Sequence, residues 1–581
     1  MASEVKRCVQ CKQDFTIESE DFNFYDQIKV PPPTWCPDCR QRRRYAWRNE
    51  RTLYKRSCDL CKKNIISIYS QNKPFKVYCT ECWWSDKWDS SSYGRDFDFS
   101  TSFFEQWQKL QLEIPRIALH NKNDNVNSEY THHSGNSKNC YFCFSIFDAE
   151  DTLYSTNVYL GNKDCCDCYH IEQGNNLLYE CVDTHKSYHC QYCLVIRDCN
   201  ECLYCYDCRG CTNCFLSTNL RNKSYYIENI PYSKEGYFEK LKEYNLNSAS
   251  GRKIIYDKFL KNLKFKALHR FAFIEKSNDV SGNIIFNSKN THYAFDATEV
   301  EDVKYGIVCV GVKNSMDSYH YGLGGSELIY ETHAMVHSYN ILFTHLSYDN
   351  SHLTYCDSCH SSENLFGCVG MKRNKYCILN KAYQPEEYKK LKEKIIAHMR
   401  ETGEYGEFFP PQLSPFGYNE TQGQVYMPFK TKEEAINSGW KWEDEATTGT
   451  FGKETLRPEA IPDTSDDVQD SILSEVLVCA DCNRNYKIIT NELNFYRREK
   501  IPIPRFCPEC RYRKRLSLRP PRKLWHRKCT CAAQKSANGV YNNSVQHFHN
   551  QNPCPNEFET SYAPDRPETV YCEQCYNSEV V

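Results

Sequence analysis

Short aromatic segments recur along the middle of the chain at intervals of about twelve residues. Brief strand-like segments, separated by Asn, Asp, Gly and Ser at so short a period, predict a parallel β-solenoid with a coil of about 12 residues, or about 24 in two similar halves. The segments begin near Asn139, Asp151, Asp164, Asn176, Tyr188, Asn200, Cys211 and Lys223, and again near Glu327, Tyr339, His352, Asn364 and Lys375.

Both repeat blocks are followed by the same kind of segment. The sequence Arg-Asn-Lys at 221–223 leads into a charged helical pattern that ends at Glu243, and the same three residues at 373–375 lead into one that ends at Glu393. Pro385 with two following acids is a good helix start. Because the open ends of a solenoid need a cover, we expect these helices to cap the blocks. The predicted fold class is therefore mainly β, with two short parallel β-solenoid blocks and helical caps.

Cysteines fall at regular intervals inside the first block. Several lie 12 residues apart, and from Cys199 to Cys214 a cysteine stands at every third position. With a coil of about 12 residues, equivalent cysteines would be about 4.8 Å apart, which is within reach of a disulfide. Three interpretations stay open: buried free thiols in a small apolar core, which we favour, a metal–thiolate cluster, and disulfide rungs.

The two ends of the chain are copies of one cysteine module. Each copy holds two Cys-x2-Cys pairs separated by 24 residues and a further cysteine 18 residues later, and the copies align without a gap. Two such pairs place four thiolates around one Zn²⁺ ion, with no open position for a substrate. We therefore predict structural zinc sites of the zinc-ribbon or treble-clef kind. Their ligands are Cys8, Cys11, Cys36 and Cys39 at one end, and Cys479, Cys482, Cys507 and Cys510 at the other.

A second cysteine quartet follows each of these sites. The distal copy has a tighter first pair and a longer insert, which contains His547, His549 and Cys554. One of these three residues could replace a cysteine, so the fourth site is the least defined. The predicted quartets are Cys58, Cys61, Cys79 and Cys82, and Cys529, Cys531, Cys572 and Cys575.

The module carries motifs that can be compared with a known family. In order they are Cys-x2-Cys, Asn-Phe-Tyr, Pro-x-Pro and Cys-Pro-x-Cys-Arg, and they occur at both ends of the chain. This pattern resembles the short "probable zinc-ribbon" domain of bacterial proteins, and the whole layout resembles uncharacterised cysteine-rich proteins of uncultured, small-genome bacteria. The resemblance implies zinc and a treble-clef-like fold, and it implies no activity.

Composition changes this picture in two ways. The chain has 73 Lys and Arg against 75 Asp and Glu, so there is no global basic excess. The first residues lack the apolar core of a signal peptide, and no segment reaches the roughly 20 apolar residues that cross a bilayer. We therefore expect a cytoplasmic protein with no membrane partner, in which the 36 cysteines hold metal or stay reduced.

Basic residues gather directly after the zinc ligands. Residues 40–56 hold eight Lys or Arg and residues 511–528 hold nine, with aromatic residues between them. Arg interleaved with aromatics suits phosphate contact and base stacking, so we predict a non-catalytic protein that contacts RNA, DNA or the ribosome. An alternative role for the arginines is to neutralise the zinc–thiolate charge. The predicted contact residues are Arg40, Arg42, Arg43, Arg44, Arg48, Arg511, Arg513, Lys514, Arg515 and Arg519.

A second function stays open, namely a scaffold that binds another protein along the aromatic face of the solenoid. No enzyme is expected, because the nucleophile-elbow, Walker and His-Glu-x-x-His motifs are missing from the sequence, and no small-molecule substrate is indicated. The predicted division is a tandem zinc-finger module at 1–100, a connector at 101–125, solenoid block 1 at 126–230, a helical cap at 231–278, solenoid block 2 at 279–381, a helix and loop at 382–430, an acidic linker at 431–475 that is flexible from Pro462 to Asp470, and a second tandem zinc-finger module at 476–581.

Overall fold

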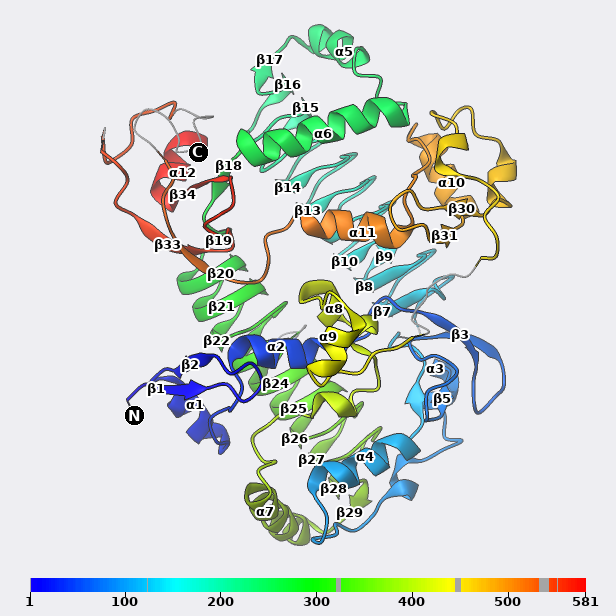
Figure 1. Cartoon of the computed structure of the whole chain (residues 1–581), viewed down its shortest axis with the longest axis vertical. Coiled ribbons are helices and arrows are strands. Elements are labelled where there is room, and N and C mark those ends of the chain that lie inside the picture. The colour runs from blue at the N-terminus through cyan, green and yellow to red at the C-terminus, as the bar shows by residue number, and fades with distance from the viewer. Residues whose placement is uncertain (1, 123, 320–324, 445–450, 532–542, 551) are drawn as a thin grey trace. The chain divides into compact units, whose positions relative to one another are not determined.

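The computed structural model describes residues 2–122, 124–319, 325–444, 451–531, 543–550 and 552–581 (Figure 1). The chain forms two compact units. Unit 1 comprises residues 1–119, 272–446 and 522–524, and unit 2 comprises residues 120–271, 447–521 and 525–581. The N-terminal cysteine module thus belongs with the second repeat block, and the C-terminal module belongs with the first. This crosswise pairing of modules and blocks is not foreseen from the sequence.

The first repeat block forms a stack of parallel strands in unit 2. Six strands pair in the order β14-β13-β12-β10-β8-β7, and a further parallel pair, β15 and β16, follows along the chain. Val182 pairs with Leu194 at an offset of 12 residues, whereas Thr156 pairs with Tyr169 at an offset of 13. The strands are β7 Thr131–Gly135, β8 Cys143–Phe147, β9 Ala149–Glu150, β10 Thr156–Tyr159, β11 Asn162–Lys163, β12 Tyr169–Glu172, β13 Val182–His185, β14 Leu194–Arg197, β15 Thr212–Phe215, β16 Ser224–Ile227 and β17 Ile230–Pro231.

The second block forms an eleven-stranded sheet in unit 1, with its strands in sequence order from β19 to β29. Its registers repeat the interval of the first block, since Ile329 pairs with Ile341 and Leu353 pairs with Leu365. The strands are β19 Ile274–Glu275, β20 Asn278–Phe286, β21 Lys289–Thr298, β22 Glu301–Lys304, β23 Val312–Tyr319, β24 Ser326–Val336, β25 Tyr339–Tyr348, β26 Ser351–Thr354, β27 Glu363–Phe366, β28 Lys375–Ile378 and β29 Lys381–Ala382.

In both stacks a residue at about every third position has a left-handed backbone conformation. Asp198, Glu201, Tyr204 and Asp207 have φ values of 52°, 52°, 54° and 47°. Such values are uncommon outside glycine, and Asn and Asp tolerate them best, which explains why these residues separate the aromatic segments. The residues that follow these four, Cys199, Cys202, Cys205 and Cys208, are all buried, so this part of the interior repeats every three residues rather than every two. This geometry explains the three-residue spacing of the cysteines from Cys199 to Cys214.

The interior cysteines make hydrogen bonds to the backbone. Cys205 Sγ donates to the carbonyl oxygen of Leu203 at 3.5 Å and lies 3.3 Å from that of Cys214, nine residues later. Serines at equivalent positions act in the same way, as Ser217 Oγ donates to the carbonyl oxygen of Phe215 at 3.0 Å. All 36 cysteines are free thiols, and within the described residues no cysteine of either stack belongs to a group that could hold a metal ion. This geometry agrees with the free-thiol interpretation.

Helices follow both stacks where the sequence predicts them. α5 (Lys234–Lys242) and α6 (Ala249–Phe265) follow the first stack, and α7 (Pro385–Glu401) follows the second (Figure 1). Tyr388 of α7 is buried and its ring lies 5.8 Å from that of Tyr376 on β28, so α7 packs on the last strands. The other helices are α1 Asp21–Ile28, α2 Pro37–Tyr45, α3 Thr80–Trp84, α4 Phe103–Glu113, α8 Gln422–Tyr426, α9 Lys432–Asn437, α10 Thr490–Arg498, α11 Pro508–Ser517 and α12 Glu573–Val580.

Short two-stranded pairs complete the terminal modules, and β18 with β34 forms a further pair in unit 2. No helix in the described part of the chain has both the length and the apolar character needed to span a bilayer. The remaining strands are β1 Glu4–Arg7, β2 Asp14–Ile17, β3 Tyr54–Ser57, β4 Asn64–Ser67, β5 Val77–Tyr78, β6 Arg116–Ile117, β18 Leu268–Arg270, β30 Leu477–Val478, β31 Asn485–Tyr486, β32 Trp525–Lys528, β33 Glu557–Thr560 and β34 Thr569–Tyr571.

The segment predicted as a flexible acidic linker is packed where the structure describes it. Ile461, Val468 and Ile472 are each at most 4% exposed and join the core of unit 2. The prediction from acidic composition was wrong here, because three apolar residues spaced through the segment anchor it. Residues 445–450 of the predicted linker lie outside the described residues.

Candidate metal centres

The first cysteine quartet joins a β-hairpin turn to the start of a helix. Cys8 and Cys11 lie between β1 and β2, whereas Cys36 is the N-cap of α2 and Cys39 lies in its first turn. The backbone N–H of Cys36 donates to Cys8 Sγ at 3.2 Å, and Cys11 Sγ lies 3.7 Å from Cys36 Sγ. All four sulfur atoms are within 4.8 Å of one another.

The third quartet reproduces this arrangement at the other end of the chain. Cys479 and Cys482 lie between β30 and β31, and Cys507 caps α11. The N–H of Cys507 donates to Cys479 Sγ at 3.2 Å, and Cys482 Sγ lies 3.7 Å from Cys507 Sγ. With Cys510, the four sulfur atoms again lie within 4.8 Å of one another. The sequence duplication is thus also a duplication of geometry.

The second quartet has the same plan with a shorter helix. Cys58 and Cys61 lie between β3 and β4, and Cys79 caps α3, which contains Cys82. Cys61 Sγ lies 3.9 Å from Cys79 Sγ, and the N–H of Cys79 donates to Cys58 Sγ at 3.3 Å.

The spacing of the sulfur atoms in these quartets suits one tetrahedral metal ion. A Zn–S bond of about 2.3 Å places two ligands of a tetrahedron roughly 3.8 Å apart. The measured separations are 3.7 Å for Cys11 and Cys36, 3.9 Å for Cys61 and Cys79, and 3.7 Å for Cys482 and Cys507. A disulfide would need about 2.05 Å. The four-cysteine groups are therefore compatible with metal binding, and each offers four protein ligands.

Hydrogen bonds lower the pKa of one cysteine in each of these quartets and so favour its thiolate, the form that binds metal, whereas the pKa values of the partner thiols, Cys39 and Cys507, are raised. The Cys39 thiol, helped by its backbone N–H, lowers the pKa of Cys36 to about 5. The Cys507 thiol likewise lowers the pKa of Cys479 to about 4. Burial opposes ionisation of Cys58, but the backbone N–H groups of Cys61 and Cys79 outweigh it and lower its pKa to about 7.

The fourth cluster contains more donors than the sequence assigns to it. Cys529, Cys531, Cys554 and Cys575 lie within 4.8 Å of one another, so the insert contributes Cys554. Cys572 is adjacent, with its Sγ 3.9 Å from that of Cys554 and its N–H donating to Cys529 Sγ at 3.2 Å. A second group of four, Cys531, His547, His549 and Cys575, overlaps the first.

The arginines that follow the first quartet are buried in ion pairs. Arg40 and Arg44, one turn apart on α2, contact Asp317 at 2.8 and 2.9 Å. Arg43 and Arg44 contact Glu331 on β24 at 2.8 and 3.1 Å. Although burial alone would lower it, Asp317 helps to hold the pKa of Arg40 well above its usual value. These pairs fix α2 to the parallel strands of unit 1, as the position of α2 in Figure 1 shows.

The same network recurs in unit 2 with equivalent residues. Arg511 and Arg515 of α11 contact Asp167 at 3.1 and 2.8 Å. Arg515 also contacts Glu180 at 3.1 Å, and Arg511 contacts Glu492 at 3.1 Å. Each module therefore attaches to a repeat block through two arginines that share one buried aspartate.

Most of the residues predicted to contact nucleic acid are therefore buried or half-buried. Arg519 is paired with Asp183 at 2.9 Å, Arg42 is half-buried over the ring of Phe429, and Lys514 is half-buried. Arg513 is the exposed member of the predicted set and lies 3.3 Å from Glu509. Six of the predicted residues are at most 3% exposed and are inaccessible to phosphate, namely Arg40, Arg43, Arg44, Arg48, Arg511 and Arg515.

The acidic partners of these arginines could not be identified from the sequence, because they lie far from the arginines along the chain. Asp317 is 277 residues from Arg40. The available signal was the four-residue spacing of Arg40 and Arg44, repeated by Arg511 and Arg515, which places each pair on one helix face.

Much of the aromatic face proposed for protein binding is also covered. Tyr330 on β24, Phe343 on β25 and Tyr355 directly after β26 are fully buried. Phe343 and Tyr355 stack at 4.7 Å, and Phe103 of α4 packs 5.2 Å from Tyr355. These rings form the core between the strands and the helices rather than a free surface.

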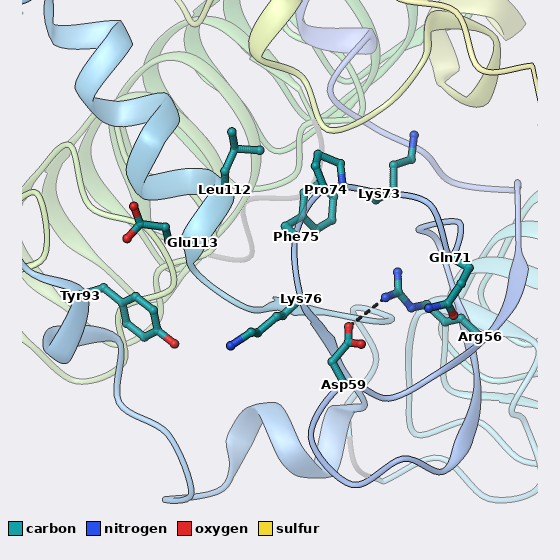
Figure 2. A pocket seen from close by; sticks show the side chains of 10 residues that line it. All are labelled: Arg56, Asp59, Gln71, Lys73, Pro74, Phe75, Lys76, Tyr93, Leu112 and Glu113. Atoms are coloured by element: carbon teal, nitrogen blue, oxygen red, sulfur yellow. Dashed lines mark hydrogen bonds and ion pairs between the residues drawn. The ribbon is translucent and has the colours of Figure 1, made fainter.

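Unit 1 also has a surface pocket of about 420 Å³ beside the second quartet (Figure 2). In Figure 2 the Arg56 guanidinium reaches the Asp59 carboxylate, and the two groups are 2.9 Å apart. Lys73 pairs with Glu420 and Glu443, each at 2.8 Å. None of the described residues that line the pocket is Ser, Cys or His, so the lining provides no such nucleophile beside a base.

No known protein-family model matches this chain, and no curated protein matches it.

Proposed function

We propose that the chain is a non-catalytic zinc protein in which four tetrahedral sites brace two β-solenoids of 12-residue coils. The observation that carries this proposal is the set of sulfur separations of 3.7 to 3.9 Å in the first three quartets. Thiolate-only tetrahedral donor sets favour zinc among the abundant divalent metals, and four protein ligands leave no place for a substrate. The resemblance to probable zinc-ribbon domains points the same way.

The bracing role follows from where the ligands lie. Cys36 and Cys507 are the N-caps of α2 and α11. The same two helices carry the arginines that pair with Asp317 and Asp167. A metal ion at the start of each helix fixes the helix against its hairpin, and the ion pairs fix it against the strands. Loss of the metal frees the helix start, so the attachment of the module to the repeat block weakens with it.

Metal analysis of the full chain tests this proposal. We expect at least four zinc ions per purified chain, and we expect a strong chelator to increase amide deuterium exchange in α2 and α11 before the parallel strands respond. Cys39→Ser should remove one zinc ion, whereas Cys377→Ser, at an interior position of the second stack, should remove none. Fewer than three zinc ions per chain, or equal losses in the two variants, would contradict the proposal.

A second candidate function, nucleic-acid binding, rests on a different surface from the predicted one. The exposed side of α6 carries Lys253, Lys261 and Lys264 against Asp257, and Lys266 is its C-cap. Within the described residues no ion pair joins these four lysines to an acid of the folded chain. An excess of three positive charges there would contact about three phosphates.

The salt dependence of binding separates this candidate from a purely structural role. With about three phosphate contacts, affinity for single-stranded RNA or DNA should fall about 20-fold between 50 and 200 mM salt. Replacing the four lysines with Gln should abolish the electrophoretic shift, whereas Arg513→Gln should leave it nearly unchanged. No shift at low salt, or a shift that survives the lysine changes, eliminates this candidate.

A further inference from the structure

The fourth cluster holds two overlapping groups of metal donors rather than one. Cys529, Cys531, Cys554 and Cys575 form the first group, and Cys531 and Cys575 form the second with two histidines of the insert. Every member of both groups is buried. The two shared sulfur atoms are 3.4 Å apart, closer than the pairs at 3.7 and 3.9 Å in the first three quartets.

His549 presents one ring nitrogen to the shared sulfur atoms. Its Nε2 lies 3.2 Å from Cys531 Sγ and 3.5 Å from Cys575 Sγ. Its Nδ1 lies 2.6 Å from the carbonyl oxygen of Asn552, so this nitrogen carries the proton. The carbonyl thereby fixes the tautomer in which Nε2 has a free lone pair, as it does for metal-binding histidines.

One ring nitrogen of His547 also lies within 4.8 Å of the sulfur atoms of Cys531 and Cys575. Its Nε2 lies 2.9 Å from Glu579 Oε1, and both side chains are 0% exposed. Its Nδ1 is buried, and none of the described residues gives it a hydrogen-bond partner. A zinc-bound imidazole usually donates one N–H to a carboxylate and coordinates the metal through the lone pair of its other nitrogen. A buried nitrogen with no partner is otherwise costly, so it indicates a ligand.

We propose that the fourth cluster binds two zinc ions bridged by the thiolates of Cys531 and Cys575. One ion takes Cys529 and Cys554 as its further ligands, and the other takes His547 and His549. Six side chains then fill the eight positions of two tetrahedra, because two of the sulfur atoms serve twice. This inference rests on the proposal that zinc fills the cysteine clusters.

Charge favours two ions over one in this buried place. Four thiolates around a single Zn²⁺ leave a net charge of −2, whereas the same four thiolates with two Zn²⁺ ions and two neutral imidazoles are neutral. A neutral group is far less costly to bury. Cys572 stays outside both tetrahedra and accepts a hydrogen bond from Asn556 Nδ2 at 3.3 Å.

Zinc counting in histidine variants tests the inference on the full chain. We expect five zinc ions per wild-type chain and four in the double variant His547→Ala, His549→Ala. His526→Ala, at an exposed position on β32, is the matched control and should keep five. Four ions in both the wild type and the double variant would overturn the second ion while leaving four structural sites in place, whereas fewer than three would overturn the zinc proposal itself.

Cobalt substitution gives a readout that does not depend on the stability of the double variant. Two Co²⁺ ions bridged by thiolates couple magnetically, so the wild-type chain loaded with cobalt should show the electron paramagnetic resonance intensity of three ions while containing five. His549→Cys supplies an alternative ligand and should keep both the fifth ion and the coupling. Uncoupled intensity from every bound ion in the wild type would overturn the bridged pair.

Discussion

Replacement of Asp167 by alanine tests how the modules attach to the repeat blocks. Asp167 is fully buried and contacts both Arg511 and Arg515 of α11. The variant leaves two guanidinium groups buried with only Glu492 and Glu180 as acidic partners. Breaking a buried ion pair on one side costs about 3–5 kcal/mol. Because the two remaining acids keep part of the interaction, we expect the lower end, about 3 kcal/mol.

Hydrogen exchange measures this loss directly, since the free energy concerns local detachment of α11 rather than global unfolding. A loss of about 3 kcal/mol corresponds to roughly 150-fold faster deuterium exchange in α11 wherever exchange follows detachment. Zinc should also leave the third site faster when a chromogenic chelator is present, because Cys507 and Cys510 belong to the same helix. Asp167→Asn, which keeps the shape and removes the charge, should resemble the alanine variant.

The matched control is a surface ion pair on the same stack. Glu150 pairs with Lys138 at 3.1 Å at the surface, so Glu150→Ala should change deuterium exchange in α11 very little. If Asp167→Ala changes exchange in α11 no more than Glu150→Ala does, the buried arginines do not hold the module. The ion pairs could then be present without contributing to the attachment of α11.

Three further outcomes follow from the structure. The interior of the first stack is narrow, so the larger side chain of Cys205→Val should overpack it and destabilise unit 2 by about 1–3 kcal/mol, and Cys205→Ala should cost less. Urea unfolding measures both losses, and the reverse order would contradict the packing. Gly282 has a φ of 142° and a Cβ there would overlap the carbonyl oxygen of Ala294, so Gly282→Ala should lower the thermal midpoint of unit 1. Gly325→Ala should have a smaller effect, because no atom of the described residues lies within 4 Å of its Cβ position. Glu499, followed by Glu201, raises the pKa of the partly exposed His189 to about 9. Because this value exceeds the unfolded pKa of about 6.5, the stabilisation is complete below pH 6.5 and is lost as the pH rises towards 9, by about 1–2 kcal/mol after allowance for solvent screening. His189→Gln should remove that pH dependence of unfolding, and an unchanged slope would disprove it.

The metal centres could be predicted well from the sequence because metal-ligand spacing is local. The turn between Cys8 and Cys11 and the helix start at Cys36 need only short segments to form. The first three quartets therefore assemble as the spacing indicates. The fourth differs because residues of its insert lie in the cluster. Local spacing does not determine which of Cys554, His547 and His549 lies close to the other ligands.

The role of the arginines could not be read in the same way. A basic tract has the same sequence whether it faces water or carboxylates, and its density suggested phosphate contact. Asp317 and Glu331, which pair with α2, come from strands nearly three hundred residues later. Only the packing of the helix on those strands shows that the charge is internal.

The repeat interval, the helices after each block and the cysteine groups at both ends could be predicted without a structure, because they depend on neighbours along the chain. Tertiary structure decided which module belongs with which block, since unit 1 combines residues 1–119 with residues 272–446. It also decided that most of the clustered arginines are buried, and that seven donors meet at the fourth cluster. These features depend on contacts between segments far apart in the chain, whose free energies are set by burial and charge pairing rather than by local spacing.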